Sequence, residues 1–371
     1  MNKLGLYVHT PFCLKKCSYC GFLSMPGCGK DTIDGYFDRM ADEARQIPSE
    51  YMVDTVFFGG GTPTLAGPEN IKKVIDSLSP FLEDGAEITM EANPKTFGLE
   101  DLRRYREAGV NRLSIGCQSL NDEVLAKLGR VHTRDEFLES YRAAREAGFD
   151  NVNVDLMFAV PGQDMNIWEE TLREVIALGP DHISAYSLQI EEGTPFYNAY
   201  KFGELEGVSD EEERRMHHLA IEMLEDAGYV HYEISNFAKP GFMCKHNLKY
   251  WNMDEYLGIG LGASSFMKGE RIKNTDDLDE YMKGSLGQER HLDTKEDLAG
   301  ETVFTGLRKR EGFLKSRFEE IVGESYDDFY QYIYEERMRY IREELLVEDE
   351  ERVYLTRKGI DRSNDIMSEF V

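Results

Sequence analysis

Short runs of β-branched and aromatic residues alternate with longer amphipathic stretches through the first half of the chain. The short runs predict six strands, at residues 4–10, 55–58, 87–92, 112–116, 151–158 and 182–190. The amphipathic stretches predict five helices, at residues 33–46, 69–81, 99–108, 134–147 and 167–177. Alternating strands and helices build parallel βαβ units. The pattern therefore predicts an α/β fold, an open and partial (β/α)6 TIM-like barrel, with a doubly wound sheet as the alternative.

The pattern changes after residue 208. A predicted helix at 210–227 is followed by a strand-like segment at 231–238 and a glycine-rich stretch at 256–266. From residue 292 onward, helices at 297–308 and 326–344 precede a hairpin at 345–356 and a terminal helix after Thr356. We predict three parts: a core barrel at 1–208, its completion at 209–291, and a small α+β winged-helix-like domain at 292–371. Because this last part is acidic, we predict that it serves as a lid or a dimerisation element and does not bind DNA.

Composition narrows the class of protein. The chain has 371 residues, 41% of them hydrophobic, which is enough for a large core and excludes global disorder. Its formal net charge of −27 argues against nucleic acid and against a polybasic membrane contact. We find neither a signal peptide nor an apolar run of about 18 residues, so no transmembrane segment is expected. Clustered cysteines in such a chain indicate a metalloprotein of the reducing cytoplasm.

Three of the six cysteines, Cys13, Cys17 and Cys20, fall within eight residues directly after the first predicted strand. They therefore lie at the rim of the barrel where ligands bind. Three thiolates can hold three irons of a [4Fe–4S] cluster and leave the fourth iron open for chemistry. Zinc, with His9 or a distant residue as fourth ligand, is the structural alternative, although the C-x3-C-x2-C spacing is not typical of zinc knuckles.

This spacing, at the end of a first strand, resembles that of the radical S-adenosylmethionine (SAM) superfamily. Further motifs follow in the expected order along the chain: Gly60, Gly61 and Thr62 in GGGTP, then Glu91, Gln118, Arg130 and Asp155. The resemblance implies that the glycine-rich turn grips the methionine part of SAM. It also implies that the acidic and amide side chains accept from amine and ribose hydroxyls, and that Arg130 pairs with a carboxylate. Tyr7 is a weaker SAM contact. The implied chemistry is one-electron cleavage of SAM to methionine and a 5′-deoxyadenosyl radical.

Within the superfamily the chain resembles the HemN/HemW group. HemN-type coproporphyrinogen III dehydrogenases carry a further cysteine two residues after the last cluster cysteine, where this chain has Phe22. The sequence His246-Asn247-Leu-Lys-Tyr250-Trp251 matches the HNxxYW motif of HemW-type haem chaperones. The resemblance implies haem ligation by His246, orientation of the imidazole by Asn247, and stacking by Tyr250 and Trp251, with Cys244 as a rival ligand. Lys245 and Lys249 are candidates to meet the propionates.

The leading hypothesis is thus a haem chaperone that binds a [4Fe–4S] cluster, SAM and haem. The alternative is the coproporphyrinogen III dehydrogenase, because residues that hold a second SAM in those enzymes are retained, including Tyr19. A tRNA-modifying radical SAM enzyme is a third hypothesis. The resemblance leaves open whether one or two SAM molecules bind and whether SAM cleavage is productive, and no catalytic residue is designated. Expected partners are haem-acceptor proteins, a flavodoxin or ferredoxin-like electron donor, and a second copy of the chain.

Overall fold

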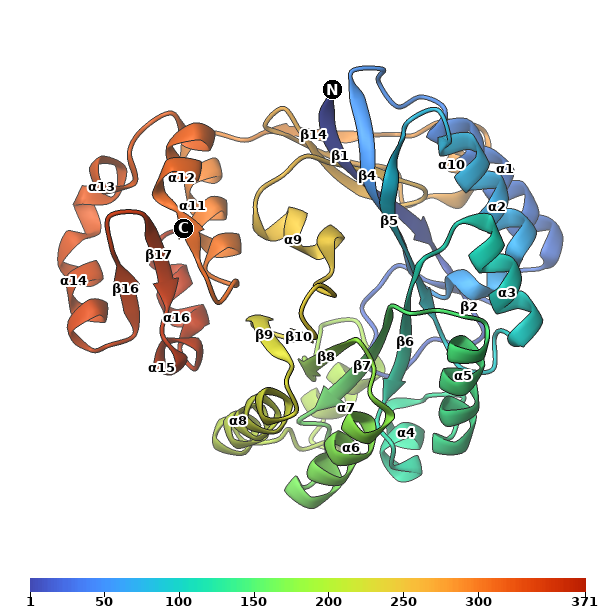
Figure 1. The fold of residues 1–371 in the computed structure, drawn as a ribbon, viewed down its shortest axis with the longest axis horizontal. Helices are drawn as coiled ribbons and strands as arrows, with labels where there is room; N and C mark the ends of the chain where they lie inside the picture. Colours follow the sequence, from blue (N-terminus) through green and yellow to red (C-terminus); the bar gives the residue numbers. More distant parts are fainter.

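A curved sheet forms the centre of the molecule in the computed structural model, which describes residues 1–371. Its parallel strands, in spatial order, are β11 (Tyr256–Ile259), β1 (Asn2–Thr10), β4 (Tyr51–Gly60), β5 (Leu82–Ala92), β6 (Arg112–Gln118), β7 (Val152–Phe158) and β8 (His182–Ser187). The sheet bends into an open ring with helices along its outer face (Figure 1). The prediction of six parallel strands in a partial, TIM-like barrel is confirmed.

The helices of this part are α1 (Lys30–Ala44), α2 (Pro68–Leu78), α3 (Leu99–Ala108), α4 (Asp122–Leu128), α5 (Arg134–Glu146) and α6 (Met165–Leu178). Local sequence fixes their ends. Thr133 and Glu136 form a reciprocal capping box at the start of α5. Gly109 and Gly179 end α3 and α6 in the left-handed conformation, as glycine at a helix C-terminus commonly does. The short helix α4 was not predicted, and strand β8 is shorter than the predicted 182–190.

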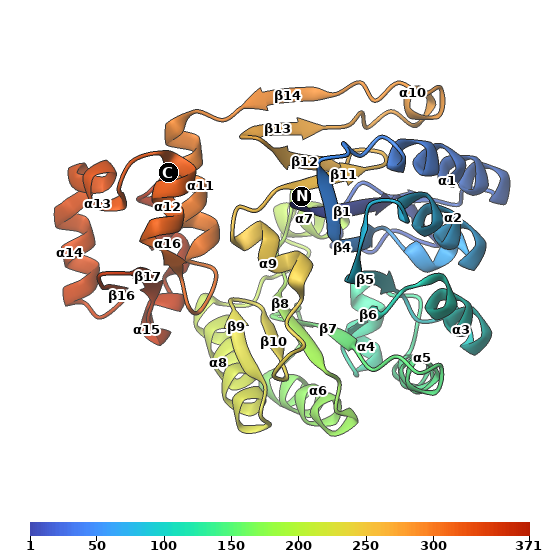
Figure 2. The same cartoon turned by 45° about the horizontal axis from the view of Figure 1, so that its top comes forward.

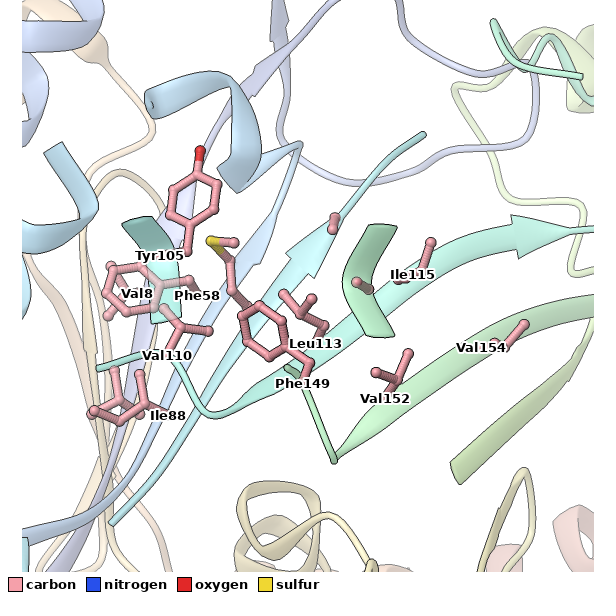
Figure 3. Close-up of a cluster of buried hydrophobic side chains, with 14 of the residues drawn as sticks. Val8, Phe58, Ile88, Tyr105, Val110, Leu113, Ile115, Phe149, Val152 and Val154 are labelled. Carbon is pink, nitrogen blue, oxygen red and sulfur yellow. The ribbon is translucent and has the colours of Figure 1, made fainter. Parts of the chain in front are cut away.

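One continuous hydrophobic core of 54 buried residues lies between the sheet and these helices. Figure 3 shows part of it, where Val8, Phe58, Ile88 and Leu113 of four successive strands meet Tyr105 of α3. Strand β1 is buried on both faces over most of its length. That burial matches the near-continuous apolar runs expected of parallel strands covered by helices.

Antiparallel strands extend the sheet at both ends. Beyond β8 lie β10 (Asn236–Ala238) and β9 (Val230–Glu233), which are preceded by α7 (Pro195–Lys201) and α8 (Asp210–Asp226). Beyond β11 lie β12 (Ser264–Met267), β13 (Glu270–Lys273) and β14 (Glu289–Leu292), with α10 (Leu278–Met282) between the last two. The glycine-rich stretch 256–266 is therefore a strand, a turn and a strand. A Cβ on Gly258 would lie 2.2 Å from the Ser264 carbonyl oxygen, so this close pairing requires glycine.

The last part of the chain has its own hydrophobic core of 17 buried residues. It contains α11 (Lys295–Gly306), α12 (Lys315–Val322), α13 (Tyr326–Phe329), α14 (Tyr334–Arg342), α15 (Arg357–Ile360) and α16 (Ser363–Ser368), and a small sheet of β15 (Phe313–Leu314), β17 (Arg352–Leu355) and β16 (Leu346–Glu348). Helices with a small wing match the predicted winged-helix-like character. The domain boundaries at 208 and 291 stay a prediction.

The predicted single helix at 326–344 is wrong. A 3-10 turn at Tyr330–Ile333 separates α13 from α14. The Tyr330 carbonyl accepts a hydrogen bond from the buried Arg337 guanidinium at 3.3 Å, and the Tyr330 hydroxyl donates to the Phe370 carbonyl at 3.1 Å. These tertiary bonds take the place of helical ones, which local sequence does not reveal.

A seven-residue helix, α9 (Lys245–Trp251), lies between the sheet and the C-terminal domain (Figures 1 and 2). It packs against β4 on one side and α11 on the other. The Arg308 guanidinium lies 4.6 Å from the centre of the Trp251 ring, and Lys309 donates to Asn252 at 2.5 Å. The segment thus joins the barrel to the C-terminal domain. No helix of the structure is both long and apolar enough to span a bilayer.

Candidate functional site

The three clustered cysteines line one cavity of about 400 Å³ at the carboxyl ends of the parallel strands. Cys13 ends the short strand β2 (Phe12–Cys13), which pairs with β3 (Met25–Pro26) and so closes the cysteine loop. All three thiols are free and partly exposed. Burial raises the pKa of Cys13 and of Cys20. Three thiols converge on one polar space, as the ligands of one inorganic centre must.

The glycine-rich turn after β4 lies directly against this loop. The backbone N–H groups of Gly61 and Thr62 donate to the carbonyls of Thr10 and Phe12, both at 2.7 Å. A Cβ on Gly61 would lie 2.6 Å from the Phe12 carbonyl oxygen, and Gly60 has a φ of +103°. Only glycine allows this approach and this backbone conformation. The turn therefore forms a backbone cradle on the wall of the cavity.

Glu91 ends β5 inside the cavity and has no cationic partner. Its Oε2 accepts from the Gly60 backbone N–H at 3.2 Å. Burial, and then repulsion from Asp155, raise the pKa of Glu91 to about 8. A buried carboxylate without a cation fits a ligand that brings a positive charge, such as an ammonium group.

Arg130 supplies the opposite charge in the same cavity, and no carboxylate pairs with it. Its Nη2 donates to Asn93 and, at 2.8 Å, to the Gly116 carbonyl, while its Nη1 lies 3.8 Å from Cys17 Sγ. Its Nε is buried and has no partner. Together with Glu91, this buried cation matches the two charges of an α-amino acid zwitterion.

Asp155, Gln118 and Tyr19 complete the predicted set within the cavity. Asp155 accepts from Ser114 at 2.9 Å and from Asn153 at 2.8 Å, and burial raises its pKa. Gln118 has a φ of +64°, an unusual backbone conformation for a residue with a side chain. The side-chain oxygens of Asp155 and Gln118 can accept hydrogen bonds from the hydroxyl groups of a sugar, and the Gln118 amide N–H and the Tyr19 hydroxyl can donate to them.

Tyr7 and His9 lie behind the cavity wall and do not line it. The Tyr7 hydroxyl and His9 Nδ1 are 3.0 Å apart, and His9 Nε2 is 3.1 Å from the Leu23 carbonyl. Both ring nitrogens of His9 are therefore engaged within the protein. His9 therefore has no free ring nitrogen for a zinc ion held by the cysteines.

The predicted haem segment lies elsewhere and is closed. His246 is 1% exposed, with Nδ1 2.9 Å from the Thr55 hydroxyl and Nε2 2.9 Å from the Tyr250 hydroxyl. Burial lowers the pKa of His246 to about 3, so the imidazole is neutral. Asn247 and Trp251 are half-buried, and the Trp251 indole N–H has no partner. The structure thus brings eleven of the predicted residues together in the cavity and places the other five outside it.

Two neighbours of the predicted haem segment are also internal. Cys244 is fully buried, its Sγ lies 3.7 Å from Glu87 Oε1, and burial raises its pKa to about 12. Lys249 pairs with Asp54 at 2.8 Å and is buried with it. Neither residue is available to a ligand in this conformation.

Sequence reasoning missed several residues of the cavity. Asn93 follows Glu91 by two positions, Tyr186 and Ser187 are the last two residues of β8, and Gln189 and Glu191 lie just beyond it. The place of the last four at a strand end was a signal that could have been used, because all parallel strands of a barrel end at the same rim. Nothing in the sequence marks the two hydrogen bonds of the Asn93 amide.

The donor set fits the groups that the sequence resemblance implies. Three soft thiols suit iron–sulfur ligation. The backbone cradle, the unpaired Glu91 and the unpaired Arg130 suit the amino-acid end of SAM. His246 does not offer a free ring nitrogen or an open face to haem in this conformation.

Comparisons with known proteins agree with this chemistry. Residues 7–175 match the family model of the radical SAM superfamily, and residues 293–362 match that of the HemN C-terminal domain. The chain is 37% identical to the heme chaperone HemW of Bacillus subtilis over 98% of both chains, and 34% identical to that of Lactococcus lactis over 98% of this chain and 96% of the other. The coproporphyrinogen III oxidase HemN of Escherichia coli, described as a radical SAM enzyme, shares the fold with a TM-score of 0.85. That structure covers 100% of this chain at 24% identity, and 90% of the HemN chain is matched.

Proposed function

The chain belongs to the HemW heme chaperone family of the radical SAM superfamily, and from that premise we propose that it binds a [4Fe–4S] cluster, SAM and haem and delivers haem to acceptor proteins. One observation carries the first half of the proposal. Three free thiols, a half-buried carboxylate without a cationic partner and a half-buried guanidinium without a carboxylate partner line a single cavity. The cluster and SAM are the pair of ligands whose chemistry matches all three features.

Each predicted residue of the cavity then has a proposed role. Cys13, Cys17 and Cys20 would hold the [4Fe–4S] cluster through their thiolates, next to the place proposed for SAM. The carboxylate of Glu91 binds the SAM ammonium group, and Arg130 binds the carboxylate. With SAM bound, the cluster supplies one electron for reductive cleavage of the sulfonium.

The other proposed contacts are with the backbone and the sugar. The turn at Gly60, Gly61 and Thr62 cradles the methionine part, and Gln118 and Asp155 accept from the ribose hydroxyls. Tyr19 and Tyr7 border the site, from inside the cavity and from behind its wall. A second SAM, if two bind, would contact Gly61, Thr62, Gln118, Arg130, Asp155 and Tyr19. Equilibrium dialysis with labelled SAM would count the SAM molecules bound to each chain.

For haem we propose the segment 246–251, with one condition that follows from its burial. His246 can ligate iron only after one ring nitrogen gives up its hydroxyl partner, Thr55 or Tyr250. For haem to reach His246, either α9 parts from β4, which carries Thr55, or the Tyr250 side chain turns away from its neighbour in the same helix. Asn247, Tyr250 and Trp251 would then line the opened site, with Lys245 near the propionates.

An anaerobic haem titration of cluster-loaded protein, followed by optical spectroscopy, tests this proposal. We expect saturable binding in the wild type and a weakened or shifted spectrum in His246→Ala. Cys244→Ala tests the rival ligand, and His291→Ala, which removes an exposed histidine outside the segment, is the matched control. An unchanged spectrum in His246→Ala with intact cluster content would remove His246 from the haem site, and absence of binding in the wild type would overturn the chaperone proposal.

Partners follow from the same proposal. Haem transfer needs an acceptor protein, and the cluster needs a one-electron donor, for which a flavodoxin or ferredoxin-like protein is proposed. A homodimer and a cytoplasmic location are further parts of the proposal, the latter supported by six free cysteines. Sedimentation of the loaded protein with and without haem would test the dimer.

A further inference from the structure

Asn93 lies on the wall of the cavity at the end of β5, where a tight turn fixes its backbone. Pro94 follows it, Lys95 has a φ of +72°, and the Thr96 N–H donates to the Asn93 carbonyl at 3.2 Å. These are the features of a type II turn. The Thr96 hydroxyl donates to the same carbonyl at 2.6 Å. The Asn93 side chain therefore starts from a rigid point.

Both ends of the Asn93 amide are engaged. Its Nδ2 donates to the Thr62 hydroxyl at 2.9 Å, and its Oδ1 accepts from Arg130 Nη2. Gly116 makes room for this contact, because a Cβ there would lie 2.8 Å from Asn93 Oδ1. One amide thus holds two side chains that come from different strand ends.

Those two side chains each reach a cysteine sulfur. The Thr62 hydroxyl donates to Cys13 Sγ at 3.7 Å, and Arg130 Nη1 donates to Cys17 Sγ at 3.8 Å. Since the Thr62 oxygen accepts from Asn93, its single hydrogen is directed toward the sulfur. The chain of contacts is Cys13–Thr62–Asn93–Arg130–Cys17, with the amide at its centre.

We propose that Asn93 is a positioning residue that aims hydrogen-bond donors at two of the three cluster ligands and so raises the reduction potential of the cluster. The inference rests on the proposed cluster at these cysteines. Hydrogen bonds to ligand sulfurs are among the factors that set the potential of iron–sulfur clusters. They stabilise the reduced state more because it carries one more negative charge. The step concerned is the addition of one electron to the cluster from an external reductant, with no bond broken.

The test is an anaerobic redox titration of reconstituted, SAM-free protein with dithionite, followed by electron paramagnetic resonance. We expect Asn93→Ala to lower the reduced-to-oxidised ratio about tenfold at a fixed potential, which is about 59 mV for a one-electron couple. Thr62→Val, which removes only the donor to Cys13, should lower the potential by part of that amount. In the Thr62→Val background, Asn93→Ala should lower the potential by less than it does in the wild type. The reason is that the contact from Asn93 through Thr62 to Cys13 has already been removed.

Ser114→Ala is the matched control, since Ser114 lines the same cavity but donates to Asp155 rather than to a sulfur. Its potential should equal that of the wild type. Unchanged potentials in Asn93→Ala and Thr62→Val, at wild-type iron and sulfide content, would overturn the inference, as would simple additivity in the double variant. If Asn93→Ala does not fold, Thr62→Val decides. A wild type that assembles no cluster contradicts the proposed function instead.

Discussion

Replacing Glu91 by glutamine should make the ligand-free protein more stable and the SAM site weaker. Glutamine keeps an oxygen for the Gly60 N–H and removes a carboxylate whose charge is buried without a cation. The folded pKa of about 8 lies above the ordinary value of 4.5. Below pH 4.5 both states are protonated, and as pH rises toward 8 the unfolded state ionises first. Glu91 therefore lowers the free energy of unfolding as the pH rises over this range.

The magnitude follows from that difference. At 1.36 kcal/mol for each pKa unit, Glu91 costs about 3 kcal/mol at pH 7 and about 5 kcal/mol above pH 8. Urea unfolding of the reduced, cluster-free protein between pH 5 and 9 should show the variant more stable by these amounts, with the difference vanishing near pH 4.5. Exposed Glu100→Gln on α3 is the control and should follow the wild type.

The same substitution should weaken SAM binding although it stabilises the ligand-free protein. In cluster-loaded protein we expect Glu91→Gln to bind SAM about tenfold or more weakly, because a hydrogen bond to a charged partner is lost. A variant that is no more stable than the wild type at pH 8, or whose advantage does not depend on pH, would refute the assignment of a buried unpaired charge. Unchanged SAM affinity would refute its role toward the ammonium group.

Three further variants test the packing around the sites by urea unfolding. Gly61→Ala places a Cβ 2.6 Å from the Phe12 carbonyl oxygen and should destabilise by about 3 kcal/mol; wild-type stability would contradict the cradle. Arg337→Ala leaves the buried carboxylate of Glu348 unpaired and should cost about 3–5 kcal/mol, whereas Arg337→Met with Glu348→Leu should recover most of it. His246→Ala leaves two buried hydroxyls without their partner and should cost about 2–4 kcal/mol even without haem; no loss would mean that the segment is open in solution.

The sequence predicted the fold and the site best where a functional motif directly follows a strand or a helix with a clear hydrophobic period. The parallel strands, the glycine-capped helices and the motif residues at strand ends were all predictable, because each strand end of a barrel meets the same rim. That geometry is why Cys13, Glu91 and Asp155, far apart in the chain, could be assigned to one place in advance.

What was not predictable depends on contacts between distant segments. The burial of His246 arises from its hydrogen-bond partners on β4 and within α9, which the motif itself does not reveal. The break between α13 and α14 depends on Arg337 reaching back to a backbone carbonyl. The place of Asn93 between Thr62 and Arg130 is likewise set by side-chain geometry, which hydrophobic periodicity does not predict.

Strand β1, which leads into the cysteine loop, has a consequence for the order of events during synthesis. Its partner β4 lies early in the chain, at Tyr51–Gly60, but its other edge is covered by β11, which begins only at Tyr256. Until β11 has been made, one edge of the strand that leads to the proposed cluster cysteines is unpaired. Iron–sulfur loading of a nascent chain would thus act on a half-built support, and insertion of the cofactor belongs after translation has passed β11.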